Sequence, residues 1–319
     1  MSGRLVTIFG GSGFVGRHLV RVLAKAGWRV RVAVRRPDLA FHLQPLGAVG
    51  QIHAVQANIR NRASIARAIA GSDAVVNLVG ILAESGRNKF ASVQAQGARF
   101  VAEEAAKAGI TTFVQLSAIG ADANSASEYA SSKAAGEAAV LAAIPSAVIL
   151  RPSIIFGPED QFFNRFAQMA RFSPALPLIG GGETKFQPVY VGDVALAAQA
   201  ALEGRAKPGA TYELGGPEVR SFKSLISYIL TLTNRSRLPL SLPFPIAKLL
   251  GSVLECLPGK FLTVDQVTLL EKDNVVSAAA RAEGRTLEGL GVDDTTIEAV
   301  VPTYLYAFRP HGQFAKAAG

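Results

Sequence analysis

Tyr129 and Lys133 are the two side chains in this sequence best suited to acid–base chemistry. Their spacing of four places both on one face of a helix. A lysine ammonium beside a phenol favours the phenolate, which readies the hydroxyl to give or take a proton. Ser117 directly follows an apolar stretch, residues 112–116, that is typical of a buried strand. We expect the three residues to form a catalytic group at a strand end, where open α/β sheets bind ligands.

A solvated tyrosine–lysine pair is the alternative interpretation, because Tyr-x-x-x-Lys also occurs by chance. The position of the pair favours the chemical interpretation, since it follows a strand-end serine and lies more than 100 residues after a glycine-rich turn.

The glycine-rich turn has the spacing G-x-x-G-x-x-G and joins an expected strand, residues 4–9, to an expected helix, residues 14–26. This is the context of a dinucleotide-binding fingerprint. Gly10 allows the tight turn, Gly13 the approach of a pyrophosphate, and Gly16 the packing of helix on strand. Backbone N–H groups at the helix start would hold the phosphate charge. A plain turn is the alternative. The predicted cofactor-binding residues here are Gly10, Gly11, Ser12, Gly13, Phe14, Val15 and Gly16.

The end of the second expected strand, residues 28–34, points to the choice of cofactor. NAD-preferring sites usually place Asp or Glu there to hold the ribose 2′-hydroxyl. This sequence has Arg35 and Arg36 instead. Guanidinium groups suit a 2′-phosphate, so we predict NADPH. Two solvated arginines are the alternative.

Later strand ends add further candidates. A third strand, residues 52–57, leads to Asn58 and Ile59, where Asn58 either contacts the adenine or forms an Asx turn. A fourth strand, residues 73–79, ends at Gly80, whose lack of a side chain lets the backbone pass near a cofactor. We therefore add Asn58, Ile59, Leu78, Val79 and Gly80 to the predicted cofactor site.

The net charge of +9 is concentrated in the first part of the chain. Residues 1–67 contain eleven basic residues and one acidic residue, Asp38. A basic region can bind nucleic acid. Here no aromatic residues alternate with the basic ones, and the excess lies where the adenosine half of a dinucleotide would bind. An anionic cofactor or an acidic partner surface therefore explains the charge better.

Several classes of protein are disfavoured. The single cysteine, Cys256, which we expect to be a buried apolar residue, excludes an intramolecular disulfide and fits a reducing compartment. No His/Cys cluster suggests a metal. No apolar run reaches the length of a spanning helix. The first strand begins so early that we expect no signal or transit peptide.

Taken together, these motifs resemble a short-chain dehydrogenase/reductase of the extended or atypical type. Further matches are Asp73 with residues 77–80, and the stretches 150–153, 156–158, 188–195 and 212–217. The resemblance implies an α/β fold: a Rossmann-type, doubly wound sheet of seven parallel strands with helices on both faces, and a small mixed C-terminal region. It further implies that Ser117 holds a substrate oxygen, Tyr129 is the acid/base and Lys133 binds the ribose. Pro152, Ser153 and Ile154 join the predicted cofactor site.

The expected domains are an NAD(P)-binding domain over residues 1–235, with parts of the substrate region inserted after about residue 155, and a mostly helical region over residues 236–319. The second region offers a partner or membrane contact.

Three stretches, residues 117–122, 149–166 and 262–276, resemble the accessory subunit of respiratory complex I from mitochondria and α-proteobacteria. The resemblance implies tightly bound NADPH, a place on the membrane-proximal side of the peripheral arm and no assured turnover. It implies complex I peripheral-arm subunits as partners, a peripheral contact with the inner membrane, and a location on the bacterial cytoplasmic side. Binding of nucleic acid or metal is not expected.

Two apolar segments allow two interpretations each. In residues 238–257, Ile246, Leu249, Leu250, Val253 and Leu257 follow helical spacing, which fits either a lid helix packed on the substrate region or a surface for membrane or partner. Residues 161–172 hold four phenylalanines and two arginines, which fit either core or a docking surface.

Two functions follow. The first is an NADPH-binding accessory subunit of complex I with a structural or assembly role and little or no turnover. The alternative is an active NADPH-dependent reductase or epimerase acting on a small carbonyl or sugar-nucleotide substrate. The trio of Ser117, Tyr129 and Lys133 favours the alternative, whereas Gln94 and Gln96, where many active members have Asn, weaken the proton relay. An NADPH-reading redox sensor is a third interpretation.

Overall fold

The computed structural model describes residues 3–255 and 262–310. By packing, the chain forms two compact units. The first comprises Met1–Pro152, Val191–Leu214 and Val276–Asp293, and the second comprises Ser153–Tyr190, Gly215–Val275 and Asp294–Gly319. The chain passes repeatedly from one unit to the other, so this division does not follow a single boundary at residue 235.

The first unit is built on a sheet of seven parallel strands in the order β11-β6-β5-β4-β1-β2-β3. This confirms the predicted doubly wound α/β fold. Val6, Ile8 and Val76 are fully buried, as expected for strands covered on both faces. The strands are β1 (Leu5–Phe9), β2 (Arg29–Val34), β3 (Ile52–Gln56), β4 (Ala74–Asn77), β5 (Thr112–Leu116), β6 (Val148–Pro152) and β11 (Thr211–Leu214).

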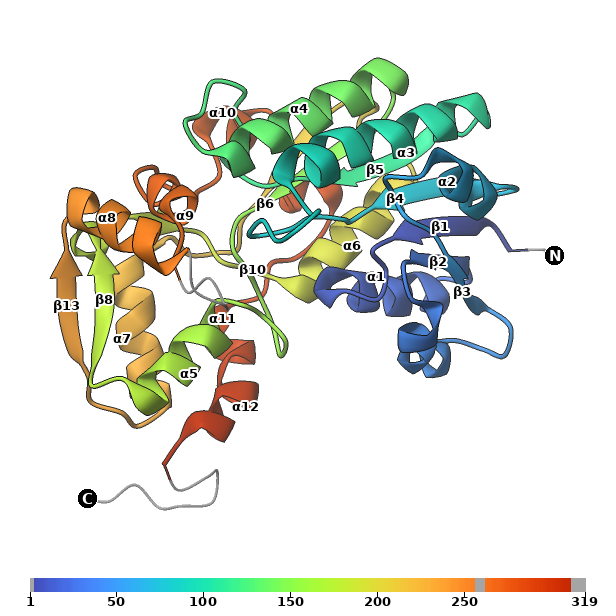
Figure 1. Cartoon of the computed structure of the whole chain (residues 1–319). Coiled ribbons are helices and arrows are strands. Elements are labelled where there is room, and N and C mark those ends of the chain that lie inside the picture. Colours follow the sequence, from blue (N-terminus) through green and yellow to red (C-terminus); the bar gives the residue numbers. More distant parts are fainter. Residues whose placement is uncertain (1–2, 256–261, 311–319) are drawn as a thin grey trace. The chain divides into compact units, whose positions relative to one another are not determined.

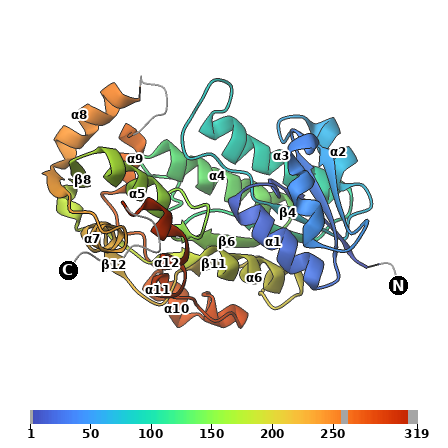
Figure 2. The ribbon, with the colours of Figure 1, turned by 90° about the horizontal axis from the view of Figure 1, so that it is seen from below.

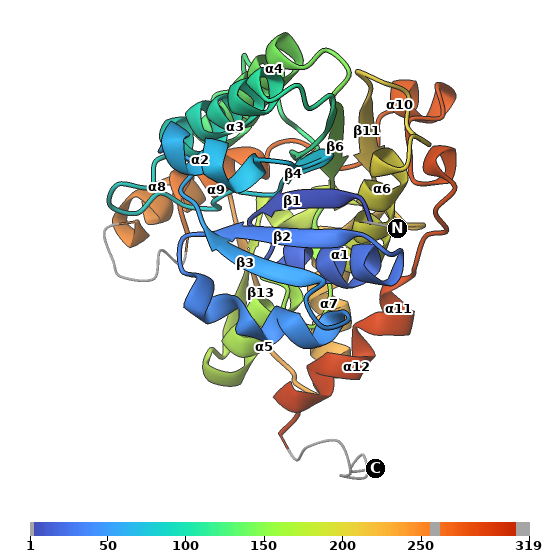
Figure 3. The ribbon, with the colours of Figure 1, turned by 90° about the vertical axis from the view of Figure 1, so that its right-hand side faces the viewer.

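Helices cover both faces of this sheet (Figures 1 and 3). One face carries α2 (Arg62–Ile69), α3 (Gln96–Lys107) and α4 (Glu128–Ala143). The other carries α1 (Phe14–Lys25) and α6 (Val191–Leu202), which lie side by side (Figure 2). The remaining helical segments of the unit are 3-10 helices over Pro37–Leu46 and Glu288–Leu290, a π-helical turn over Ala91–Ala95, and α10 (Ala278–Ala282).

The hydrophobic core of the first unit lies between the sheet and helices α2 to α4. Phe9, Phe113 and Ile149 extend from the strands, and Ile65 and Val101 extend from the helices. All are buried, so burial of apolar area is the main force that holds the helices on the sheet. The carboxyl ends of the parallel strands share one edge of this rigid sheet, and the loops that follow them bear the predicted site.

The second unit contains short paired strands and helices. The pairs are β7 (Ile155–Phe156) with β10 (Val189–Tyr190), β9 (Lys185–Phe186) with β12 (Arg220–Ser221), and β8 (Ala175–Ile179) with β13 (Leu238–Leu242). The helices are α5 (Phe163–Phe172), α7 (Phe222–Leu232), α8 (Phe244–Leu254), α9 (Val264–Leu269), α11 (Ile297–Val300) and α12 (Pro302–Leu305), with 3-10 helices over Gly180–Gly182 and Tyr306–Phe308.

The phenylalanine-rich segment 161–172 is mostly core. The ring of Phe162 packs against Phe163, Phe166, Phe186 and Phe222, with centroid distances from 5.1 to 6.1 Å. Such tilted aromatic contacts add to the free energy of area burial. Within this segment only Phe172 is an exposed large apolar residue. The core interpretation of the segment is therefore confirmed.

Helix α8 has the opposite arrangement. Ile246, Leu249, Leu250 and Val253 are exposed, whereas the small residues Ala247 and Gly251 are buried. The helix therefore packs on the second unit through its small residues, while the large apolar residues of the predicted spacing face outward, and the choice between a lid helix and a surface for membrane or partner stays a prediction. Cys256 and Leu257 lie outside them. Among the described helices, none is both long and apolar enough to span a bilayer.

Candidate functional site

The glycine-rich turn between β1 and α1 adopts the expected geometry. Gly10 has a φ of +80°, a conformation that residues other than glycine rarely adopt. The N–H of Gly13 donates to the carbonyl of Gly10 at 3.0 Å, which closes the turn. A Cβ atom on Gly16 would lie 2.5 Å from the Gly10 oxygen and from Gly11 backbone atoms, so only glycine allows the helix to approach so closely.

This turn is suited to hold an anion. Gly13 caps α1 without a side-chain hydrogen bond, and no acidic residue occupies the first helical turn. The first N–H groups of a helix have no acceptor within the helix and carry partial positive charge. Ser12, Phe14 and Val15 are partly exposed beside this end, whereas Gly11 is buried. The backbone fits a pyrophosphate, and the predicted role of these residues stays a prediction.

The two arginines after β2 have different surroundings. Arg36 forms an exposed ion pair with Asp38, with Nη2 donating to Oδ2 at 2.7 Å. This hydrogen bond lowers the pKa of the Asp38 carboxyl. Arg35 is exposed and forms no ion pair with any described carboxylate. Arg35 is therefore the guanidinium that can meet a 2′-phosphate without giving up a partner.

Asn58 forms an Asx turn, one of its two predicted roles. Its Oδ1 accepts from the N–H of Arg60 at 3.0 Å. Ser64 supports the turn, since its hydroxyl accepts from the N–H of Asn58 and donates to the Asn58 carbonyl. Ile59 is buried beneath α3, where a Cβ atom on Gly97 would lie 2.5 Å from its Cδ1. Its side chain therefore supports the loop from below.

The loop after β4 brings a second backbone segment to the same edge. Leu78 donates its N–H to Phe9 at 3.0 Å, and Val79 donates to Oδ1 of Asn77 at 3.2 Å. A Cβ atom on Gly10 would lie 3.3 Å from Val79, so this loop touches the glycine turn. Asp73, at the other end of the strand, accepts from the N–H of Leu5 at 2.6 Å and thus stabilises the sheet.

Lys133 lies between the Tyr129 ring and the end of β5, the strand that Ser117 follows. Lys133 Nζ lies 3.4 Å from the carbonyl of Leu116, the residue before Ser117, and 5.8 Å from the centre of the Tyr129 ring. Phe90 packs edge-on against that ring at 5.8 Å. Because Lys133 is buried, the interpretation as a solvated tyrosine–lysine pair is wrong.

Burial shapes the electrostatics of this group. Desolvation lowers the pKa of Lys133 to about 8, and the charge of Glu137 partly offsets this effect. Glu137 is itself held by two hydrogen bonds from Arg151. The Oγ atom of Ser117 is buried and has no hydrogen-bond partner among the residues that the structure describes. An orphaned hydroxyl costs free energy unless a bound molecule satisfies it, as a substrate oxygen would.

Gln94 is a site residue whose environment the sequence did not reveal. It lies in the π-helical turn before α3, and such turns are frequent at functional sites. Its Nε2 donates to Ser132 Oγ at 3.2 Å, and its Oε1 is buried without a partner. A Cβ atom on Gly80 would lie 3.5 Å from this Oε1 and 3.2 Å from Lys133 Nζ. Gln96 is exposed and lies outside this group.

The last predicted cofactor residues follow β6. Pro152 ends the strand in the first unit, whereas Ser153 and Ile154 belong to the second. The Ser153 hydroxyl donates to the carbonyl oxygen and Oδ1 of Asn274, at 2.9 and 2.7 Å. Ile154 accepts from the N–H of Val189 at 3.0 Å. These contacts give a structural role to Asn274, which belongs to the stretch 262–276 that resembles the complex I accessory subunit. Asn274 holds Ser153, the first residue of the second unit.

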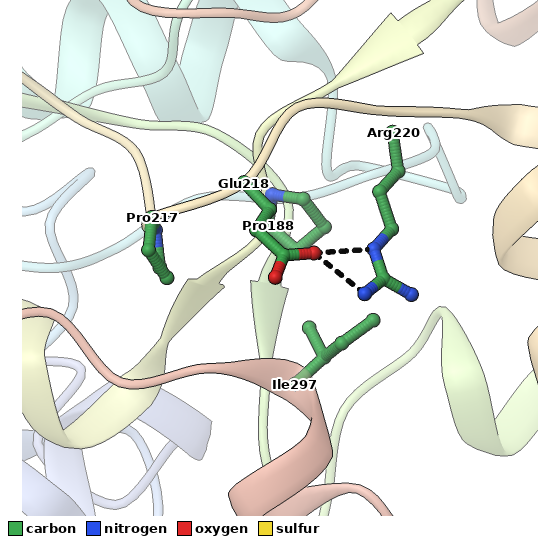
Figure 4. Close-up of a pocket in the computed structure, with 5 residues that line it drawn as sticks. All are labelled: Pro188, Pro217, Glu218, Arg220 and Ile297. Carbon is green, nitrogen blue, oxygen red and sulfur yellow. Dashed lines mark hydrogen bonds and ion pairs between the residues drawn. The ribbon is translucent and has the colours of Figure 1, made fainter.

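A small pocket in the second unit is too small to bind a ligand. It is lined by Pro188, Pro217, Glu218, Arg220 and Ile297 (Figure 4). Its volume of about 10 Å³ holds no more than one water molecule. Arg220 points at Glu218 and also pairs with Glu298, so its charge is already compensated. The described residues contain no cluster of His, Cys, Asp and Glu that could hold a metal.

Comparisons with known proteins agree with this geometry. The model of the NAD dependent epimerase/dehydratase family matches residues 6–215. A mitochondrial protein of Arabidopsis thaliana, named NADH dehydrogenase (ubiquinone) 1 alpha subcomplex subunit 9, is 38% identical over 87% of this chain and 72% of its own length. The protein of the same name from Mus musculus is 33% identical over 93% of this chain and 78% of its own length. The predicted kinship with complex I accessory subunits is thereby confirmed.

A solved structure shows the same fold. The dTDP-glucose 4,6-dehydratase DesIV of Streptomyces venezuelae, solved with NAD and TYD bound, superposes with a TM-score of 0.71. It is 20% identical and covers 94% of this chain and 95% of its own. At this identity the likeness concerns the fold alone.

Proposed function

The chain belongs to the NAD dependent epimerase/dehydratase family, and we propose that it is an NADPH-binding accessory subunit of respiratory complex I. Its role there is structural or in assembly, with little or no turnover. The observation that carries this proposal is the similarity, over most of the chain, to two mitochondrial proteins named as subunits of NADH dehydrogenase. The glycine turn, the Gly80 loop and Lys133 supply a dinucleotide site for this role.

The choice of NADPH is supported by the end of β2. No acidic residue stands directly after the strand to hold a ribose 2′-hydroxyl, and Arg35 presents a free guanidinium there. A guanidinium forms charge-assisted hydrogen bonds with phosphate oxygens. The excess of basic residues in the first part of the chain favours the same anionic ligand.

Low turnover is supported by the surroundings of Lys133. Gln94 borders the lysine with an amide oxygen that has no partner. At this place many active members have Asn, and glutamine in its stead weakens the case for the usual proton relay. Cofactor binding needs only the backbone turn, Tyr129 and Lys133.

The proposed partners are subunits of the complex I peripheral arm. The proposed location is the cytoplasmic side of a bacterial inner membrane, in peripheral contact with it. The exposed apolar side chains of α8 support such a contact, since soluble monomers rarely leave a whole apolar helix face uncovered.

The test is to solubilise membranes gently, separate the complexes by native size and locate this chain. We expect it to migrate with NADH:quinone oxidoreductase activity. A chain found only as a free monomer or dimer would contradict the proposal. The variant Gly13→Asp, which places a carboxylate at the pyrophosphate position, should impair assembly because the charges repel.

An active reductase or epimerase is the second candidate, and the orphaned Ser117 hydroxyl favours it. Bound NADPH would supply a hydride to a carbonyl carbon. Ser117 would donate a hydrogen bond to the carbonyl oxygen, Tyr129 would give that oxygen its proton, and Lys133 would favour the resulting phenolate. Oxidation of NADPH by a small carbonyl compound in the presence of purified protein, lost in Tyr129→Phe, would establish this function.

A further inference from the structure

One stretch of the second unit exposes large aliphatic side chains along its whole length. We call it the apolar ribbon; it comprises β13 and α8. Figure 1 shows the two elements in succession, with β13 paired to β8. Its exposed members are Leu238 and Leu240 on the strand and Ile246, Leu249, Leu250 and Val253 on the helix.

Helix α8 turns its small face inward. Ala247 is fully buried with Ile179 and Val267. A Cβ atom on Gly251 would lie 3.1 Å from the backbone of Val264, so the helix approaches α9 closely on this side. On the outer side, Leu249 is 67% exposed and Val253 is 61% exposed. Apart from Phe244 at its start, the helix packs through its small residues and leaves its larger apolar face to something outside the unit.

The beginning of the apolar ribbon adjoins four arginines, which we call the arginine cluster: Arg171, Arg235, Arg237 and Arg309. Helix α7 ends in a left-handed residue, Asn234, with a φ of 50°, after which the chain turns back into Arg235. Arg235 donates to the carbonyl of Phe308 at 3.1 Å, and Arg309 donates to Leu232 at 2.8 Å. Cations are favoured at such helix ends.

The other two arginines belong to the same cluster. Arg237 donates to the carbonyl of Ala170 at 2.8 Å, directly before Arg171. Burial and then the positive charges of Arg237 and Arg171 lower the pKa of Arg235. None of the four forms an ion pair with a carboxylate among residues 3–255 and 262–310. Backbone carbonyls satisfy only part of the guanidinium groups of Arg235, Arg237 and Arg309, so the cluster keeps a net positive charge and free donors.

The arginine cluster adjoins the start of the apolar ribbon, because Arg237 directly precedes Leu238, and α8 follows the other end of β13 (Figure 1). Phe172, 75% exposed, adds an aromatic ring beside Arg171. Guanidinium groups without carboxylate partners favour an anionic occupant, and an exposed aliphatic face favours an apolar one. The interfacial zone of a bilayer offers both within a few ångströms. The free edge of β13 suits the headgroup level, where water satisfies its backbone, better than the hydrocarbon.

We propose that the arginine cluster and the apolar ribbon together form a docking surface for an anionic phospholipid bilayer. This surface deepens the proposed function, on which it rests, by assigning the membrane contact of the subunit to named residues. Arg171 and Arg237 meet phosphate groups, while Leu249 and Val253 enter the boundary between headgroups and acyl chains.

The test is flotation of the purified full-length protein with vesicles of phosphatidylcholine alone or mixed with phosphatidylglycerol. We expect binding to the anionic vesicles that falls as salt is raised. Arg171→Gln with Arg237→Gln should weaken binding about 30-fold. Leu249→Ser with Val253→Ser should weaken it at least about tenfold. An unchanged thermal midpoint shows that each variant is folded.

Matched controls come from exposed residues of the first unit. Arg21→Gln with Arg29→Gln removes the same charge, and Leu39→Ser with Val49→Ser removes similar apolar surface. Neither control should change vesicle binding by more than about twofold, apart from the weak long-range effect of net charge.

Absence of binding to anionic vesicles at low salt, or binding that neither test variant weakens, would overturn the proposal. If the wild-type protein ignores vesicles while Leu249→Ser with Val253→Ser abolishes migration with complex I, the surface binds a protein subunit and the lipid assignment is wrong. Vesicle binding without migration in complex I would instead contradict the proposed function and leave the lipid surface standing.

Discussion

Replacing Gly16 by alanine tests the proposed cofactor site most directly. The new Cβ atom would lie 2.5 Å from the Gly10 oxygen and from Cα and C of Gly11. Carbon atoms in contact normally stay 3.5–4.0 Å apart, so the start of α1 must move away from the turn by roughly 1 Å. The obstacle is backbone on both sides, so a change of rotamer cannot relieve it.

The expected cost follows from this overlap. Overpacking of a well-packed site lowers the free energy of unfolding by about 1–3 kcal/mol. For a protein of 319 residues each kcal/mol corresponds to a shift in Tm of about 1.5 °C. A displacement of about 1 Å takes oriented N–H groups away from the phosphate, and each hydrogen bond to a charged group is worth about 1.5–3 kcal/mol. We therefore expect the Kd for NADPH to rise about 100-fold.

The assay is a fluorescence titration with NADPH, accompanied by thermal unfolding with and without the cofactor. Gly27→Ala is the matched control, because Gly27 follows the same helix with a φ of +82° and has no atom within 4 Å of an added Cβ. This backbone strain should cost about 1–2 kcal/mol of stability without changing the Kd. Wild-type NADPH affinity in Gly16→Ala would refute the reasoning, as would equal weakening in Gly27→Ala.

Three further results are expected. Arg35→Ala should weaken the binding of NADPH about tenfold and leave the binding of NADH unchanged, because it removes a charge-assisted hydrogen bond to the 2′-phosphate. Arg36→Ala should weaken NADPH binding less. Equal loss of affinity for both cofactors would contradict the assignment. Tyr129→Phe should leave migration with complex I intact if the subunit proposal holds, whereas it should abolish NADPH oxidation by a carbonyl substrate if the reductase proposal holds. Lys133→Met should raise the stability of the cofactor-free protein at pH 7 by about 3 kcal/mol, since the buried ammonium titrates near 8 rather than 10.5. Between pH 8 and 10.5 the unfolded chain keeps the Lys133 proton that the folded protein has lost. The free energy of unfolding of the wild type should therefore rise with pH through that window, and the stability advantage of the variant should disappear. A constant difference across that range would contradict the burial of the charge.

The elements that carry the site were predictable because their signals are local. Gly10 must adopt positive φ in a tight turn, and Gly16 must let a helix touch that turn, so their spacing specifies a strand–turn–helix unit without any distant residue. Tyr129 and Lys133 share a face because helical geometry alone places residues four apart together. Buried parallel strands are similarly visible as short apolar runs.

The polar contacts of individual candidates were not predictable, since each depends on a partner that local patterns do not identify. Ser153 is bound by Asn274, which lies 121 residues later. Gln94 turns inward because a π-helical turn precedes α3. Arg35 and Arg36 are equivalent in sequence, yet only Arg36 pairs with Asp38, because the 3-10 helix after β2 presents that carboxylate to it.

The sequence by itself therefore determined the Rossmann-type sheet, the position of the dinucleotide turn and the shared helix face of Tyr129 and Lys133, since turns and periodicities act over a few residues. Only the tertiary structure decided which face of α8 is buried. Its helical spacing is equally consistent with packing through Leu249 and Val253 or through Ala247 and Gly251. The close approach of α9 to Gly251 selects the second, because a small face lets two backbones come together, and it leaves the large apolar side chains outside.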